Sequence, residues 1–211
     1  MNSFDVVDRF EERVAEFAGS RYAVATNTGT SALFLSMMYF HEQPENQMQW
    51  FVRLPARTFI SVPMAAIHAG YDVEFEDIEW HGVYQIKPWA IFDGALRFRR
   101  GMYRGGLHCL SFHARKLLNI GEGGMILTDD HDAYHWLRRA RYSGRAGPAY
   151  AIEYVTMLGW QAYMTPEKAA RGLHLMDYVE DWPDQEMQYP DLREAPFFKN
   201  RSTAAAFQRA A

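Results

Sequence analysis

One stretch of the sequence combines a lysine, a hydroxyl group and a glycine-rich turn in an order that suits an aldehyde cofactor. Residues 111–124 read SFHARKLLNIGEGG, so Lys116 follows a predicted strand and Ser111 ends it. A lysine forms a Schiff base only through its uncharged amine, which requires a site that controls the lysine pKa. A lone lysine in a loop is more often a solvated surface charge, so the neighbouring pattern decides between the two interpretations.

A second candidate site is Asn27-Thr28-Gly29-Thr30-Ser31, between a short predicted strand and an apolar helix. Gly29 permits close approach of the backbone, and the free N–H groups that open a helix favour a phosphate. The alternative is an ordinary capped helix that binds nothing.

The elements that must position these residues alternate between strands and helices. Apolar spacing and turn residues predict helices over 4–17, 32–40, 58–69, 132–142 and 165–179, and strands over 22–26, 51–54, 73–77, 89–93, 107–112 and 125–128. This βα alternation predicts an α/β fold with a mostly parallel sheet. Beyond Asp181 the pattern dissolves, and Trp182, Tyr189, Phe197 and Phe198 either belong to a disordered tail or anchor it to the body or to a second subunit.

Five blocks of the sequence follow one another in the order found in a known family. They are FAGSRYAVATNTGTSAL, RLPARTFISVPMAAIHAGYDVEFEDI, AIFDGALRF, SFHARKLLNIGEGG and LGWQAYMTPEKAARGL, and they cover most of residues 14–176. The chain thereby resembles the DegT/DnrJ/StrS-type family of sugar aminotransferases, which depend on pyridoxal 5'-phosphate (PLP). The resemblance implies a three-layer α/β/α architecture, a reduced version of the large domain of PLP fold type I.

The resemblance also implies a role for particular residues. Lys116 resembles the lysine that holds PLP and moves a proton during catalysis, and Asp93 resembles the carboxylate that keeps the pyridine nitrogen protonated. Asp93 otherwise reads as a cap of the turn before Gly94. The remaining cofactor contacts implied are a phosphate cradle of Gly29, Thr30 and Ser31, a phosphate hydroxyl on Ser111, and an aromatic ring on Phe59 that stacks on the cofactor.

The chain departs from the family pattern in several places. Only residues 79–88 separate the acidic strand from the strand that bears Asp93, so at least one βα unit is missing and we expect a narrower sheet. We expect a cofactor-binding domain over 1–180, a tail over 181–211, and no small C-terminal domain. Leu96 replaces a family glutamine, and Gln161-Ala162-Tyr163 replaces an Asn-x-Arg that reaches the neighbouring subunit.

Composition argues against several other classes of protein. A net charge of −4 and a pI near 6.1 give no general reason for binding to nucleic acid or to a membrane surface. Cys109 is the single cysteine, which excludes an internal disulfide, and we expect a cytoplasmic protein. The histidines lack metal-ligand spacing, GEGG is not a dinucleotide motif, and the basic run 97–104 reads as a solvated face; we therefore expect no metal and no NAD.

The function that these patterns favour is an aminotransferase acting on a keto sugar, nucleotide-linked, with glutamate as the donor implied by the resemblance. A homodimer is expected because the family completes each site from a neighbouring subunit. Two alternatives stay open. The chain is either a reduced, non-catalytic relative that keeps the fold as a binding or assembly module, or a PLP enzyme of another reaction type.

Overall fold

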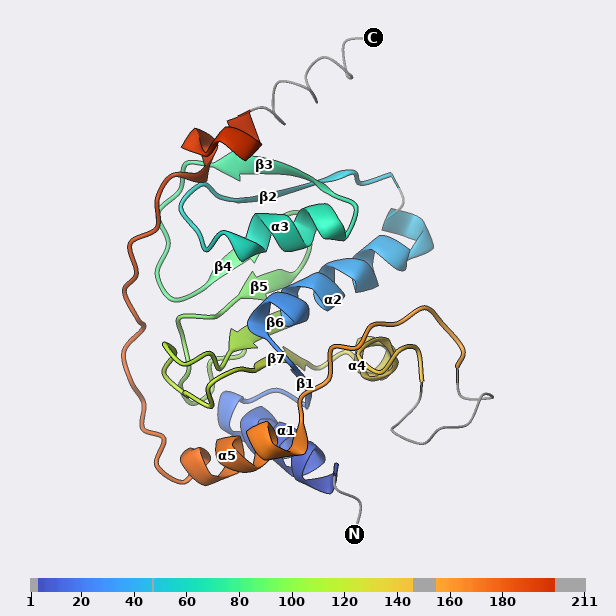
Figure 1. Cartoon of the computed structure of the whole chain (residues 1–211), viewed down its shortest axis with the longest axis vertical. Helices are drawn as coiled ribbons and strands as arrows, with labels where there is room; N and C mark the ends of the chain where they lie inside the picture. The colour runs from blue at the N-terminus through green and yellow to red at the C-terminus, as the bar shows by residue number, and fades with distance from the viewer. Residues whose placement is uncertain (1–3, 47, 146–154, 200–211) are drawn as a thin grey trace.

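The computed structural model describes residues 4–46, 48–145 and 155–199. Its helices and strands follow one another as α1 (Asp5–Ala18), β1 (Tyr22–Thr26), α2 (Gly29–Glu42), β2 (Phe51–Pro55), α3 (Ser61–His68), β3 (Asp72–Glu76), β4 (Tyr84–Ile86), β5 (Ile91–Asp93), β6 (Leu107–Ser111), β7 (Gly124–Thr128), α4 (His131–Ala140) and α5 (Pro166–Met176) (Figure 1). Every predicted helix and strand is present, with bounds that differ by a few residues. Strand β4 is additional.

Helix α1 shows how local sequence sets these bounds. Its residues Val7, Phe10, Val14 and Phe17 are buried at helical spacing. Gly19 then adopts a left-handed φ of 82°, and its N–H donates to the Ala15 carbonyl at 2.8 Å, which ends the helix.

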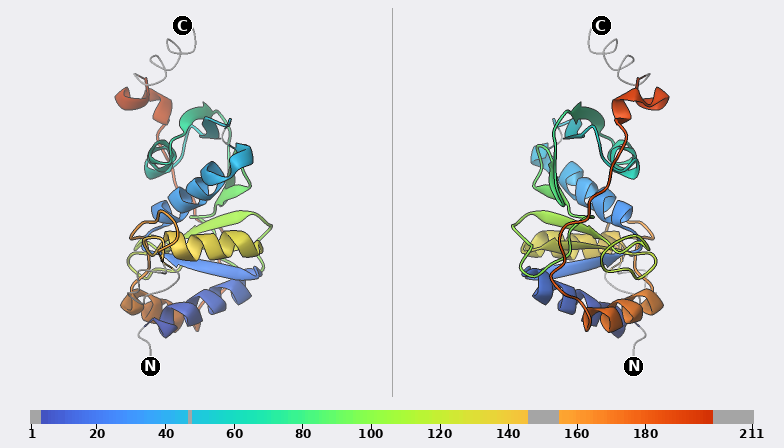
Figure 2. Two further views of the ribbon diagram at one scale, coloured as in Figure 1. Left: turned by 90° about the vertical axis from the view of Figure 1, so that its right-hand side faces the viewer. Right: turned by 90° about the vertical axis from the view of Figure 1, so that its left-hand side faces the viewer.

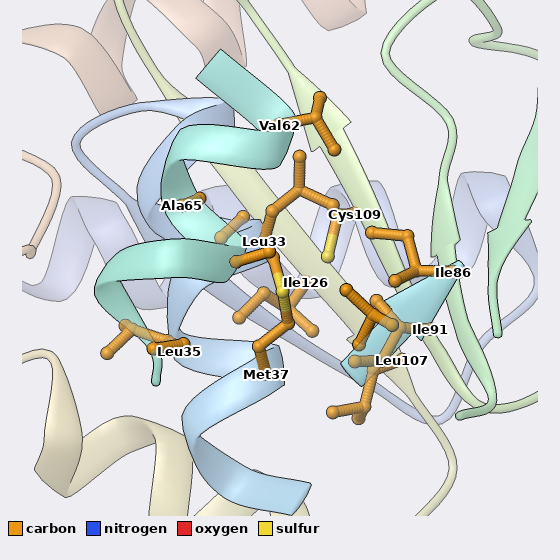
Figure 3. Packing of buried hydrophobic residues seen from close by; sticks show 14 of the residues in the cluster. Leu33, Leu35, Met37, Val62, Ala65, Ile86, Ile91, Leu107, Cys109 and Ile126 are labelled. Atoms are coloured by element: carbon orange, nitrogen blue, oxygen red, sulfur yellow. The ribbon is translucent and has the colours of Figure 1, made fainter. Parts of the chain in front are cut away.

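The sheet lies between two helical layers, as predicted. Helices α2, α3 and α4 cover one face, and α1 and α5 cover the other (Figures 1 and 2). Successive strand residues alternate between the two cores: Cys109 of β6 packs in the first, and Leu110 packs in the second. Figure 3 shows the first core, where Leu33 and Met37 of α2 meet Ile91, Leu107 and Ile126 of the sheet.

The prediction of a mostly parallel sheet is wrong for the main sheet. Its order is β1-β7-β6-β5-β4, and only β5 and β6 pair in parallel; β2 and β3 form a separate parallel pair. The segment 87–90 that joins β4 to β5 is too short for the crossover of a dozen or more residues that parallel neighbours require, so these two strands pair antiparallel. The shortened segment 79–88 therefore supplies a three-residue antiparallel strand, β4, in place of a βα unit.

The described part of the tail, residues 181–199, is anchored to the body of the molecule. From the end of α5 it runs along one side of the molecule to β3 (Figures 1 and 2). Arg97 donates to both carboxylate oxygens of Asp184, at 2.8 and 2.5 Å, and Leu192 N–H donates to the Ala56 carbonyl at 2.9 Å. Phe198 packs edge-on against Phe75 of β3. Residues 181–199 therefore follow the alternative in which the tail is anchored to the body and not the one in which it is disordered.

Candidate functional site

A cavity of about 250 Å³ opens where β5 and β6 end and α2 begins. Because β5 and β6 are parallel, their last residues, Asp93 and Ser111, lie at the same edge of the sheet. Six of the seven predicted site residues line the cavity: Gly29, Thr30, Phe59, Asp93, Ser111 and Lys116. Ser31 does not. The fold thus brings the predicted residues together, while their roles toward a cofactor stay predictions.

The first turn of α2 forms one wall of the cavity. Thr28 caps the helix by accepting a hydrogen bond from Ser31 N–H at 3.0 Å. The Ser31 hydroxyl lies 2.9 Å from the Thr28 hydroxyl, which explains why Ser31 belongs to the cap and not to the cavity lining. The Thr30 hydroxyl instead hydrogen-bonds to the hydroxyl of Ser61 at the start of α3, 2.7 Å away. Hydroxyl groups and a helix N-terminus together suit a phosphate.

Two glycines allow this wall to approach the sheet. A Cβ on Gly29 would lie 2.8 Å from the Cβ of Ser111, and a Cβ on Gly124 would lie 2.3 Å from the Thr28 carbonyl oxygen. Both distances are shorter than real Cβ contacts, so only glycine fits at either position. The GEGG turn is therefore needed for close packing of β7 against the first turn of α2.

The carboxylate of Asp93 is fixed at both oxygens. Ala95 N–H donates to Oδ1 at 2.9 Å, and the Tyr84 hydroxyl donates to Oδ2 at 2.8 Å. The residue is only 6% exposed. Burial raises the pKa of Asp93, while the hydrogen bonds from Ala95 and Tyr84 and the charge of Lys116 oppose that rise. The site thus holds a buried, oriented carboxylate at the end of β5.

Lys116 lies in the loop between β6 and β7. The loop is held by hydrogen bonds from Lys116 N–H to the His113 carbonyl at 2.8 Å and from Ala114 N–H to the Gly121 carbonyl at 2.9 Å. Burial lowers the pKa of the Lys116 ammonium, and the negative charge of Asp93 partly opposes this shift. A lowered pKa increases the fraction of uncharged amine, the form that attacks an aldehyde.

Aromatic side chains form the mouth of the cavity. Phe59 is 53% exposed there, and its ring lies 6.3 Å from that of Tyr189. Tyr189 also stacks on Trp80, with an interplanar angle of 14°. Met187 and Tyr189 belong to the tail, so the tail contributes part of the cavity wall.

Sequence reasoning missed several residues of the site, namely Thr58, Ser61, Trp80, Tyr84, Met187 and Tyr189. Ser61 had a signal, because it lies two residues after Phe59 in the block TFIS. Tyr84 had none: it faces Asp93 only through the pairing of β4 with β5. Of the two tail residues, Tyr189 had only its aromatic character as a signal, and Met187 had none.

Other polar features have structural partners. The thiol of Cys109 is buried 3.2 Å from the Ser36 hydroxyl, and burial raises its pKa, which disfavours the nucleophilic thiolate form. In the basic run, Arg97 pairs with Asp184 and Arg100 lies over the Phe17 ring. Within the part of the chain that the structure describes, no helix is long and apolar enough to cross a membrane, and no three potential ligands gather to hold a metal.

This chain is similar in sequence to curated proteins. The chain is 26% identical over 229 residues to the spore coat polysaccharide biosynthesis protein SpsC of Bacillus subtilis, covering 83% of this chain and 57% of the relative. It is 23% identical over 215 residues to GDP-perosamine synthase of Caulobacter vibrioides, covering 82% and 56%. The chain therefore spans a little over half the length of these curated relatives.

Solved structures show the same fold. Helicobacter pylori PseC, an aminotransferase involved in the biosynthesis of pseudoaminic acid, superposes with a TM-score of 0.70 at 14% identity, covering 91% of this chain and 79% of that one. An aminotransferase from Psychrobacter cryohalolentis gives 0.68 at 19% identity, covering 84% and 57%. The predicted α/β fold of PLP fold type I is confirmed by these likenesses. A family profile matches residues 1–93 and 99–200, and the chain belongs to the DegT/DnrJ/EryC1/StrS aminotransferase family.

Proposed function

We propose that this chain binds PLP and transfers an amino group to a keto sugar, nucleotide-linked, with glutamate as the donor. The observation that carries the proposal is the convergence of Lys116, Asp93 and the start of α2 on one cavity. These residues fit the cofactor chemically. A partly buried lysine suits its aldehyde, a buried carboxylate suits its ring nitrogen, and the helix start beside Gly29 suits its phosphate.

Each residue has a distinct task in this proposal. Bound PLP supplies an electron sink for the substrate carbon that loses its proton. Lys116 would hold the cofactor through its amine and would carry the proton that leaves the substrate carbon, and its lowered pKa suits both tasks. Asp93 keeps the ring nitrogen protonated. The hydroxyls of Thr30 and Ser111, which line the cavity, would bind the phosphate, and Phe59 would cover the ring.

Absorbance spectroscopy tests the proposal directly. The purified protein with saturating PLP is expected to absorb at about 420 nm, the signature of a cofactor bound through a lysine. Glutamate is then expected to convert the cofactor slowly to its amine form, with absorbance moving to about 330 nm. Absence of the first band refutes cofactor binding. A stable first band with glutamate and a panel of other amino acids refutes transamination.

A binding module is the second candidate, and the size of the cavity favours it. The volume of about 250 Å³ lies below the roughly 300–1,000 Å³ typical of small-molecule sites. Met187 and Tyr189 of the tail occupy part of its rim. A chain that holds PLP but does not admit a bulky sugar would show the first absorbance band without turnover of any nucleotide sugar.

We also propose that the chain acts in the cytoplasm and forms a homodimer. Residues 1–180 are proposed as the cofactor-binding domain and residues 181–211 as the tail; residues 200–211 lie outside the described part of the chain. Beside the cavity, Phe59 and Ile60 are 53% and 42% exposed, and a second subunit would cover such apolar surface. Light scattering is expected to give twice the mass of one chain. A strictly monomeric protein that binds PLP tightly would contradict the assembly.

A further inference from the structure

The hydroxyl of Tyr84 reaches Asp93 from the neighbouring strand. Antiparallel pairing of β4 with β5 places Tyr84 directly opposite Asp93, and the two residues are 5% and 6% exposed. The Tyr84 hydroxyl lies 2.8 Å from Asp93 Oδ2. Strand β4 lies in segment 79–88, which is shorter than the corresponding segment of the family pattern. The contact between Tyr84 and Asp93 therefore depends on this shortened segment.

A second hydroxyl lies behind Tyr84 and fixes the direction of the hydrogen bonds. Thr58 Oγ1 is 2.6 Å from the Tyr84 hydroxyl, and Thr58 is 1% exposed. A phenol has one proton, and an ionised carboxylate only accepts hydrogen bonds. When Asp93 is ionised, Tyr84 therefore donates to Asp93, and Thr58 donates to Tyr84. Burial strongly raises the pKa of Tyr84, so the phenol keeps the proton that it donates.

We propose that Tyr84, supported by Thr58, is a positioning residue that keeps Asp93 ionised and oriented toward the ring nitrogen of the cofactor. This inference rests on the proposed function. Without Tyr84, Oδ2 of Asp93 would lose its hydrogen-bond donor, and because Asp93 is only 6% exposed, little water could replace that donor. A buried carboxylate with a missing donor takes up a proton more readily.

The variant Tyr84→Phe tests this role because it removes the hydroxyl and keeps the ring. Carbon-13 NMR of the Asp93 carboxyl in the cofactor-free protein is expected to show a pKa higher by about one unit or more, as expected for loss of a hydrogen bond to a charged group. The affinity for PLP is expected to fall about tenfold at neutral pH. Nitrogen-15 NMR of labelled PLP is expected to show the ring nitrogen losing its proton at lower pH than in the wild type.

Two further variants make the test specific. Tyr103→Phe removes the hydroxyl of another buried tyrosine, which accepts from Asp129 N–H and does not line the cavity, and is expected to leave all three measurements unchanged. Thr58→Val is expected to shift them in the same direction as Tyr84→Phe by a smaller amount, and it serves if Tyr84→Phe does not fold. An unchanged Asp93 pKa in a folded Tyr84→Phe or Thr58→Val protein overturns the inference. A wild type that does not bind PLP refutes the proposed function instead, and the Asp93 titration still tests the hydrogen bond.

Discussion

Replacement of Lys116 by alanine is expected to abolish covalent attachment of PLP. In the wild type, borohydride reduction should fix the cofactor irreversibly on this side chain, because reduction turns the Schiff base into a stable amine. Mass spectrometry of a proteolytic digest should locate the added mass on the peptide that contains Lys116. The lysine lies in the cavity with Asp93, and burial lowers its pKa, so it is the amine best prepared for the reaction.

Lys168 provides a matched control for this experiment. It lies on α5, and its Nζ comes close to Gly121 of the same loop, but it does not line the cavity. Lys168→Ala is expected to keep the absorbance at about 420 nm and the borohydride label. If Lys168→Ala lost the borohydride label and Lys116→Ala kept it, the cofactor would be attached to Lys168, and the proposed role of Lys116 would be wrong.

The sequence predicted the parts of the site that depend on local pattern. Lys116, Ser111 and the glycines of GEGG lie in one continuous segment, and Asp93 ends a short apolar strand, but it was the resemblance to the family, more than spacing, that singled out Asp93. Gly29 was predicted from its position before a helix and from the same resemblance. The structure adds why that glycine is required, since a Cβ there would collide with Ser111.

The parts that were missed depend on contacts between distant segments or between strands. Strand β7 pairs antiparallel with both β1 and β6, and the alternation of strands and helices in the sequence did not predict this direction. Nothing in the sequence around Tyr84 indicates a role in the site, because Tyr84 meets Asp93 only through the pairing of β4 with β5. The path of the tail depends on the Arg97–Asp184 pair, whose members are 87 positions apart, and no periodicity in the sequence connects them.

The tail also affects what the cavity admits. Asp184 is tied to Arg97, and Gln185 N–H donates to the Leu96 carbonyl at 2.8 Å, so the residues just before Met187 are held at the loop that follows Asp93. Tyr189 is held by its contact with Trp80. The part of the cavity wall around Met187 is therefore held in place both before and after that residue. It lies beside the loop that follows Asp93, the carboxylate on which the proposed chemistry depends.

With saturating PLP, replacement of Asp93 by asparagine is expected to slow catalysis while the cofactor stays attached to Lys116. The amide keeps the shape of the side chain and an oxygen that accepts from Ala95 N–H, but it has no negative charge. Lys116 is untouched, so the absorbance at about 420 nm should persist. The ring nitrogen would lose the charge that keeps it protonated, and the cofactor would withdraw electrons less strongly. A hydrogen bond to a charged group contributes about 1.5–3 kcal/mol, so glutamate-driven conversion should slow by roughly 10- to 100-fold.

The comparison variant for this measurement is Asp129→Asn, which removes a carboxylate that accepts from Arg21 N–H away from the cavity. It should convert the cofactor at the wild-type rate. Stopped-flow absorbance with saturating glutamate measures the chemical step, so weaker binding of either substrate does not mimic the effect. Wild-type rates in Asp93→Asn would mean that the ring nitrogen works without this carboxylate. The hydrogen bonds from Ala95 and Tyr84 would then serve the packing of β5 and not the chemistry of the cofactor.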